Sequence, residues 1–191
     1  MITRLDPQTY RRTPWKNGGG VTVDIADEYA DGVAPGSWSG MLWRFGRTQI
    51  VAGGPFSDLS GFDRILTVIG GRGLVLQIEG GKALDVREPF RPVRFNGEDK
   101  ITSQLEAGPV AVLNLLADRT RYTIDVAILS RGDTRTADAA INLVYAFENS
   151  AVAVGGKAFT LGADEALRVD GAAEVAVKSG RIALGSVIPK G

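Results

Sequence analysis

Residues 65–78 read ILTVIGGRGLVLQI, two short apolar runs joined by a turn that contains three glycines. Short runs rich in Val, Ile and Leu are typical of β-strands. Glycine supplies the positive φ values that tight hairpin turns need. The segment therefore predicts a β-hairpin with strands at 65–69 and 74–78.

The same pattern recurs along the whole chain. Turn pairs such as Gly80-Gly81, Asn96-Gly97, Gly155-Gly156 and Asp170-Gly171 separate further short apolar runs. Strands are expected at residues 21–25, 41–45, 110–116, 123–129, 141–147, 151–154, 174–177 and 182–187. Helix is expected only in short pieces, for example at 137–140. Strands this short and this regularly interrupted predict an all-β sandwich or barrel and exclude a parallel α/β sheet.

The composition changes near Asp118. All three Trp and five of the seven Phe precede it, whereas the rest of the chain is richer in Ala and Gly. We therefore expect two β halves, residues 1–118 and 119–191. Binding pockets are lined mainly by apolar and aromatic side chains, so the first half is expected to carry the ligand pocket.

Charge and residue usage exclude several classes of protein. Lys and Arg total 22 and so do Asp and Glu, and no basic run is interleaved with aromatics, so we expect no nucleic-acid partner. No apolar run approaches the length of a membrane span or a signal peptide, so we expect a cytoplasmic protein with no membrane partner. A homodimer is compatible with the sequence. The chain has no His and no Cys, so a histidine-held metal and thiol chemistry are excluded, and we expect no cofactor and no metal site.

The most distinctive segment is PWKNGGG at residues 14–20. Three glycines let the backbone approach another surface closely. Beside them Lys16 offers a cation and Asn17 an amide that both donates and accepts. The segment is either part of a ligand site or a tight turn anchored by Trp15. It is not a phosphate-binding loop, because the order of a Walker motif is absent and no helix follows.

A second segment runs GPFSDLSGFDR from residue 54 to 64 and leads into a strand. Side chains alternate along a strand, so Asp63 and Arg64 should face opposite sides. An inward Arg64 is costly unless it meets an anion, which favours a carboxylate ligand. The alternative is a structural Arg–Asp pair, perhaps with Asp24.

Two further polar residues lie inside apolar strands. Arg44 shares a strand face with Leu42 and Gly46, so it faces either solvent or a polar lumen. Asn114 interrupts the run at 110–116, and a buried Asn must be hydrogen-bonded. We interpret Asn114 as a ligand contact or as an amide that fixes the fold beside the pocket.

These segments together resemble the HutD/Ves family of double-cupin proteins. The resemblance rests on residues 14–20 with Thr22, on Trp43-Arg44, on residues 54–57 and 61–64, and on Leu113-Asn114-Leu115. It covers about the first 118 residues. It implies a bicupin fold of two β-barrel or jelly-roll-like halves, and an association with histidine utilisation. Metal-dependent cupins carry two His in this region, and here neither alignment of their motif supplies one.

The resemblance and the residue chemistry together predict a metal-independent protein that binds a small acidic metabolite, such as formylglutamate or urocanate, and regulates histidine or amino-acid catabolism. Arg64 would hold the carboxylate, and no catalytic residue is assigned. The ligand-binding candidates are Trp15, Lys16, Asn17, Arg44, Phe56, Ser57, Asp63, Arg64 and Asn114. One alternative is a metal-independent enzyme that uses Lys16 with Asp63, and another is a structural or protein-interaction module.

Overall fold

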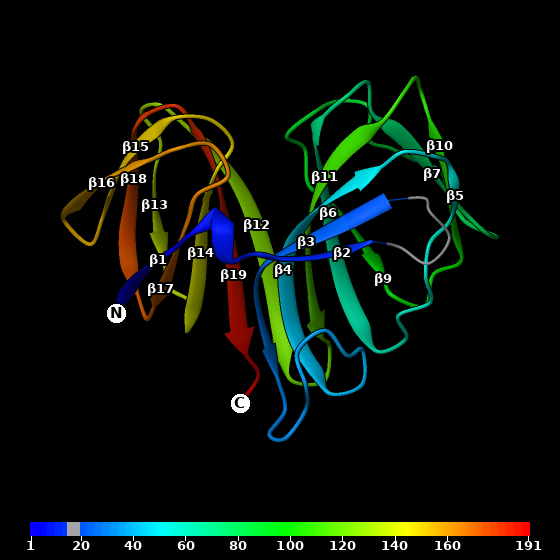
Figure 1. Cartoon of the computed structure of the whole chain (residues 1–191), viewed down its shortest axis with the longest axis horizontal. Helices are drawn as coiled ribbons and strands as arrows, with labels where there is room; N and C mark the ends of the chain where they lie inside the picture. The colour runs from blue at the N-terminus through cyan, green and yellow to red at the C-terminus, as the bar shows by residue number, and fades with distance from the viewer. Residues whose placement is uncertain (15–19) are drawn as a thin grey trace. The chain divides into compact units, whose positions relative to one another are not determined.

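The computed structural model describes residues 1–14 and 20–191, and it divides into two compact units. The first unit is Arg11–Arg121, and the second combines Met1–Tyr10 with Tyr122–Gly191. Both units are built almost wholly from short antiparallel strands (Figure 1), so the predicted all-β class is confirmed. The sequence-based boundary at 118 places residues 1–10 in the first half, whereas β1 (Ile2–Leu5) pairs with a strand of the second unit.

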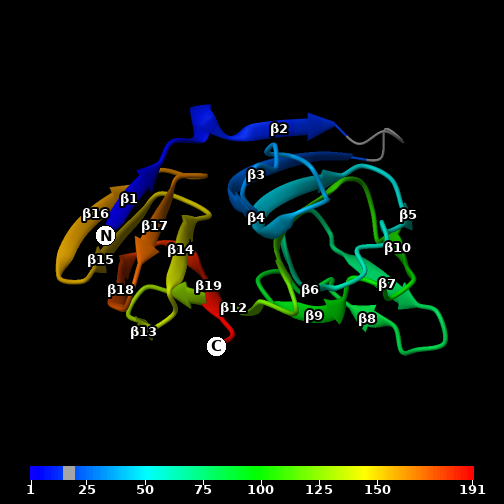
Figure 2. The ribbon, with the colours of Figure 1, turned by 90° about the horizontal axis from the view of Figure 1, so that it is seen from below.

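The first unit contains two sheets, one of six strands in the order β2-β3-β4-β11-β6-β9 and one of four in the order β5-β10-β7-β8. Figure 2 shows β3 and β4 on one side of this unit and β7 and β8 on the other. The strands are β2 (Arg11–Pro14), β3 (Gly20–Tyr29), β4 (Met41–Ile50), β5 (Gly54–Pro55), β6 (Phe62–Gly70), β7 (Leu74–Ile78), β8 (Leu84–Asp85), β9 (Val93–Asn96), β10 (Ile101–Leu105) and β11 (Val110–Asp118).

The strands predicted at 65–69 and 74–78 are present as β6 and β7, but the predicted hairpin is wrong: β6 pairs with β11 and β9, β7 pairs with β10 and β8, and the turn between them carries the chain from one sheet to the other. Gly71 has a φ of 85°, in the region that favours glycine, and a Cβ there would lie 2.4 Å from the Pro109 carbonyl oxygen. Fully burying a Val or Leu side chain contributes roughly 1.5–3 kcal/mol. The residues that form the core between the sheets are Ile50, Leu66, Val68, Leu74, Leu76, Val86, Phe95, Ile101, Val110 and Val112.

The second unit also contains two sheets, in the orders β1-β17-β14-β19-β12 and β13-β18-β15-β16. A 3₁₀ turn at Pro7–Thr9 follows β1. The remaining strands are β12 (Tyr122–Ser130), β13 (Thr134–Ala137), β14 (Ile141–Ala146), β15 (Ser150–Val154), β16 (Lys157–Leu161), β17 (Ala166–Asp170), β18 (Ala173–Ser179) and β19 (Arg181–Pro189). Leu143, Val144, Leu161 and Leu184 are among its buried apolar residues.

The short helix expected at 137–140 is wrong. Ala137 ends β13, which pairs with β18, and residues 139–140 form a bend. Thr134 and Thr136 are β-branched and favour a strand, and pairing with β18 outweighs the helix preference of the alanines.

Candidate functional site

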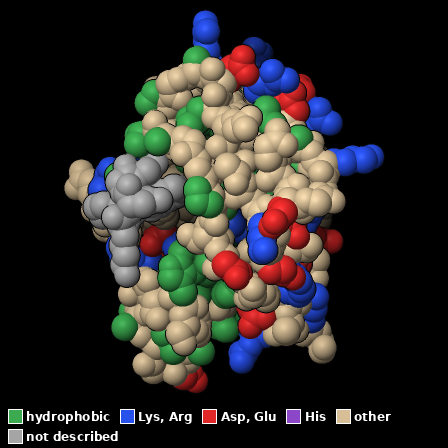
Figure 3. All heavy atoms as spheres, turned by 90° about the vertical axis from the view of Figure 1, so that its right-hand side faces the viewer, with side chains coloured by type: hydrophobic (Ala, Val, Ile, Leu, Met, Phe, Trp, Pro, Cys, Tyr) green, Lys and Arg blue, Asp and Glu red, His purple; other side chains and the backbone are tan. Residues whose placement is uncertain are grey.

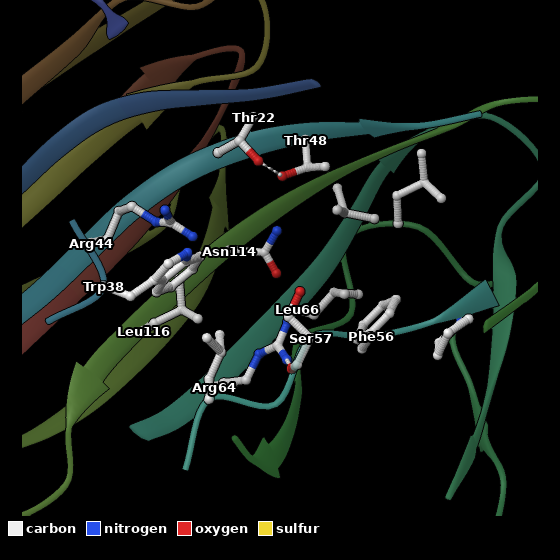
Figure 4. Close-up of a pocket in the computed structure, with 14 residues that line it drawn as sticks. Thr22, Trp38, Arg44, Thr48, Phe56, Ser57, Arg64, Leu66, Asn114 and Leu116 are labelled. Atoms are coloured by element: carbon white, nitrogen blue, oxygen red, sulfur yellow. Dashed lines mark hydrogen bonds between the residues drawn. The ribbon is translucent and has the colours of Figure 1, made fainter. Parts of the chain in front are cut away.

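A cavity of about 90 Å³ lies in the first unit, beside the inner face of its six-stranded sheet. One water molecule needs roughly 10–15 Å³ of cavity volume, so this cavity has room for a small molecule. Figure 4 shows its lining side chains. They are Thr22, Trp38, Arg44, Thr48, Ile50, Pro55, Phe56, Ser57, Leu59, Arg64, Leu66, Val112, Asn114 and Leu116.

Strand register explains why these residues meet. Leu116 of β11 lies opposite Arg44 of β4 and opposite Arg64 of β6, so both arginines stand in one row across the sheet. In the next row Asn114 lies between Gly46 and Leu66. Residues directly opposite on antiparallel strands share a face, so both arginines and the amide point into the same cavity.

Gly46 makes room beside this row. Asp24 of β3 pairs with Gly46, and a Cβ on Gly46 would lie 2.7 Å from the Val23 carbonyl oxygen. The same Cβ would lie 3.5 Å from Asp24 Oδ1. A glycine here therefore lets β3 and β4 approach closely and leaves space for the Asp24 carboxylate next to Arg44.

Arg64 is the least compensated charge of the cavity. Its guanidinium lies over two aromatic rings, with Cζ 5.1 Å from the centroid of Phe56 and 4.8 Å from that of Phe95. Its Nη1 donates a long 3.5 Å hydrogen bond to the Ser57 carbonyl oxygen, and its Nε is buried without a hydrogen-bond partner among residues 1–14 and 20–191. Within the described part of the chain Arg64 has no acidic partner. Burial, and to a smaller extent Arg44, lower the pKa of Arg64 to about 10.

Arg44, in contrast, has a counter-charge. Its Nε lies 3.5 Å from Asp24 Oδ1, and its side chain is 14% exposed. Asp24 also accepts a 2.8 Å hydrogen bond from Arg11 Nη2, and the same nitrogen contacts Asp27. Burial lowers the pKa of Arg44, while the charges of Asp24 and Asp27 oppose that effect.

Trp38 lies over Arg44, with the arginine Cζ 4.2 Å from the ring centroid. The indole comes from the loop between β3 and β4 and is 45% exposed. Tyr29 anchors this loop, since its hydroxyl accepts a 2.8 Å hydrogen bond from the Gly36 amide. Thr22 and Thr48 complete the wall and share a hydroxyl hydrogen bond of 3.3 Å. The cavity thus combines two cations with an amide, hydroxyls and aromatic rings.

The structure brings together five of the residues selected from the sequence: Arg44, Phe56, Ser57, Arg64 and Asn114. Trp15, Lys16 and Asn17 lie outside the described residues. Asp63 faces away from the cavity, as alternation with Arg64 requires, and accepts a 2.8 Å hydrogen bond from Arg119 Nε. Arg119 also binds Glu98 at 2.6 Å, so Asp63 belongs to a surface ion-pair group.

Trp38, Thr22 and Thr48 line the cavity but were not selected from the sequence. An isolated Trp in the polar run SWSG at 37–40 is the only local signal for Trp38. Thr48 shares the strand face of Arg44, four residues earlier, and this period could have located it.

Two negative observations apply to residues 1–14 and 20–191. No group of three or more acidic, His or Cys side chains there is placed to hold a metal ion. No helix within the same residues is long and apolar enough to cross a membrane. On the face of the first unit seen in Figure 3, acidic and basic side chains lie next to one another.

Comparison with known proteins identifies relatives over most of the chain. The HutD family model matches residues 7–184. A 21.2 kDa Pseudomonas putida protein from the region 3′ of hutC is 34% identical over 122 residues, which span 64% of this chain and 61% of that relative. The structure of HutD from Pseudomonas fluorescens SBW25, determined in a formate condition, is 30% identical with a TM-score of 0.85, and each chain is covered completely.

Other solved structures bear on the fold. A conserved protein of unknown function from Pseudomonas aeruginosa PAO1 is 23% identical with a TM-score of 0.87. The alignment covers 98% of this chain and 99% of that protein. A cupin 2 barrel protein from Leptotrichia buccalis is 9% identical with a TM-score of 0.55, over 90% of this chain and 89% of its own. The similarity to the Leptotrichia buccalis protein shows a cupin-type fold. In each unit the strands form two separate sheets that are not closed into a single barrel. Because the family model spans nearly the whole chain, the protein belongs to the HutD family, which is linked to the histidine-utilisation locus.

Proposed function

We propose that this protein binds a small carboxylate in the cavity of the first unit, without a metal, and that binding regulates histidine catabolism. One observation carries the proposal: Arg64 is a buried cation whose Nε has no hydrogen-bond partner and which has no acidic partner among the described residues. A buried charge is costly unless it is paired, and removing that cost is what a bound carboxylate would do. Formylglutamate and urocanate are candidate ligands because both carry carboxylates and belong to histidine breakdown.

The surroundings of Arg64 suit a planar anion. Phe56 and Phe95 contact the guanidinium, which leaves the N–H groups at its edge for in-plane hydrogen bonds. Arginine binds carboxylates through such paired N–H groups. The relative from Pseudomonas fluorescens was solved in a formate condition, and formate is the smallest carboxylate. With a pKa of about 10, Arg64 remains protonated at neutral pH.

A binding role also explains how the protein could act on a pathway. A protein that binds a metabolite without consuming it responds to the concentration of that metabolite. Ligand binding to the native state raises its stability by mass action and can stabilise one form of a protein over another. The association with the hutC region supports histidine catabolism as the pathway.

The test is calorimetric titration of the protein with formate, urocanate and formylglutamate, together with melting curves. Arg64→Lys keeps the charge but loses the planar fork. Affinity should fall by roughly 1.5–3 kcal/mol, or about one to two decades. Arg64→Ala should cost at least as much.

Arg119→Lys is the matched control, because Arg119 lies in the same unit but its hydrogen bonds go to Asp63, Glu98 and the Phe62 carbonyl oxygen. It should leave affinity unchanged. If folded Arg64→Ala binds an authentic ligand as tightly as the unsubstituted protein, Arg64 is not in the site and the proposal is wrong.

A further inference from the structure

The two arginines of the cavity differ in how their charges are balanced. Arg64 has aromatic rings and one carbonyl oxygen as its described neighbours. Arg44 belongs to a group with Arg11, Asp24 and Asp27, held by contacts of Arg11 to both carboxylates and of Arg44 to Asp24. This group has two positive and two negative side chains, so its net charge is zero.

This balance leaves the cavity with one excess positive charge among the described residues, and the charge lies at Arg64. The Asp24 carboxylate is deeply buried, with 4% of its side chain exposed, so its charge acts on the cavity with little screening by water. A second anion placed at Arg44 would therefore meet the field of Asp24 as well as that of the arginine.

The Arg44 end of the cavity still offers hydrogen-bond donors. Arg44 is fixed between Asp24 and the ring of Trp38. Figure 4 shows the guanidinium of Arg44 and the amide of Asn114 pointing into the same space, on the side of the cavity away from Phe56. The Asn114 side chain has no hydrogen-bond partner within residues 1–14 and 20–191, and it lines the cavity. Because the charge of Arg44 is already balanced by its carboxylate neighbours, and Asn114 is uncharged, these donors suit an uncharged acceptor such as an amide or keto oxygen.

Resting on the proposed function, we infer that the ligand places a single carboxylate at Arg64 and an uncharged hydrogen-bond acceptor at Arg44 and Asn114. The ligand class is a monocarboxylate with a carbonyl, amide or ring-nitrogen acceptor at the opposite end. A ligand with two carboxylates can enter only if its second carboxylate stays in solvent at the mouth. Trp38 covers the end of the cavity at Arg44 and favours a planar group of the ligand there.

The test compares matched pairs of short acids that differ in one group: malonate with malonamate, succinate with succinamate, and glutarate with glutaramate. In each pair one carboxylate is replaced by a carboxamide of nearly the same shape. Titration at neutral pH should show the half-amide binding at least about tenfold more tightly than the diacid in the pair that fits best, because a second buried carboxylate lacks its own counter-charge. Equal or tighter binding of the diacid in every pair that binds would overturn the inference and leave the carboxylate site at Arg64 intact.

A single substitution can change the charge balance at Arg44. Asp24→Asn removes one negative charge beside Arg44, so the preference for the half-amide should shrink by about tenfold or invert. Asp63→Asn is the control, since Asp63 is also paired with an arginine but lies outside the cavity, and it should keep the preference of the unsubstituted protein. An unchanged preference in a folded Asp24→Asn protein would contradict the charge argument. If Asp24→Asn fails to fold, the titrations of the unsubstituted protein with the diacid and half-amide pairs still test the inference. If no acid of the series binds, the proposed function fails and this inference fails with it.

Discussion

Replacing Arg64 with Met should make the protein more stable while abolishing carboxylate binding. Met is unbranched and of similar length, so it can cover the rings of Phe56 and Phe95 without a charge. Most substitutions at buried positions destabilise a protein. A gain in stability here would show that the charge of Arg64 destabilises the ligand-free protein, as expected of a residue that serves ligand binding.

The size of the gain follows from the environment of Arg64. Burial lowers its pKa to about 10, which corresponds to a cost of roughly 3 kcal/mol for the charged form in the folded state. The two contacts with aromatic rings offset roughly 0.5–1 kcal/mol each. The net gain on substitution is therefore about 1–2 kcal/mol.

The sign of this cost is fixed by the direction of the pKa change. The folded state binds the proton of Arg64 less tightly than the unfolded state does, so the cost is complete at every pH below the folded pKa. It disappears only as the pH rises above about 10 toward the ordinary pKa of arginine in the unfolded chain. Measurements near pH 7 therefore contain all of it.

Urea denaturation at neutral pH without ligand measures the effect, and the midpoint should rise with no change in the slope. The melting temperature should rise by roughly 2–4 °C per kcal/mol for a chain of this size. Arg119→Met is the control, because it breaks ion pairs of 2.8 Å to Asp63 and 2.6 Å to Glu98 and should lower stability. If Arg64→Met destabilises the protein as much as Arg119→Met does, Arg64 is a structural residue and the reasoning about its unpaired charge is wrong.

Three further predictions concern the fold and the absence of metal. Gly46→Ala should cost about 1–3 kcal/mol of unfolding free energy, because its Cβ would meet the Val23 carbonyl oxygen at 2.7 Å, whereas Gly54→Ala, which has nothing within 4 Å, should cost far less; equal urea midpoints would contradict this. Asn142→Ala should cost about 2–3 kcal/mol, since the buried amide donates to the carbonyls of Ala139 and Gly171 and accepts from Ser186, and an unchanged midpoint would show that these bonds contribute little. The purified protein should contain no stoichiometric zinc, iron, copper or nickel, and chelator should leave its melting temperature unchanged; elemental analysis that finds about one equivalent would overturn the metal-independent account.

Much of the fold could be predicted from local sequence. The strands at 65–69 and 74–78 and the turn between them are predictable because apolar runs and glycine turns are local signals, whereas the pairing of these strands with β11 and β10 instead of with each other is not. Strands such as β1 and β13 were missed because they are short and polar, and they exist only through pairing with β17 and β18. Such pairing joins residues more than a hundred positions apart in the case of β1, and no local pattern encodes it.

The site was only partly predictable for a similar reason. Alternation predicted that Asp63 and Arg64 face opposite sides, and the structure shows which of them faces the cavity. The row that joins Arg44, Leu116 and Arg64 depends on the register of three strands, which the sequence alone does not determine. The contacts of Asp24 with Arg11 and Arg44 depend on two further registers, those of β2 with β3 and of β3 with β4.

The most direct test of the central claim is a crystal structure of the protein with the tightest-binding carboxylate from the titrations. Our account predicts the carboxylate in the cavity of the first unit, with its oxygens about 2.7–2.9 Å from guanidinium nitrogens of Arg64. It also predicts that the rest of the ligand extends toward Arg44 and Asn114. A ligand bound elsewhere, with its carboxylate on surface lysines or arginines and the cavity filled only by water, would contradict it.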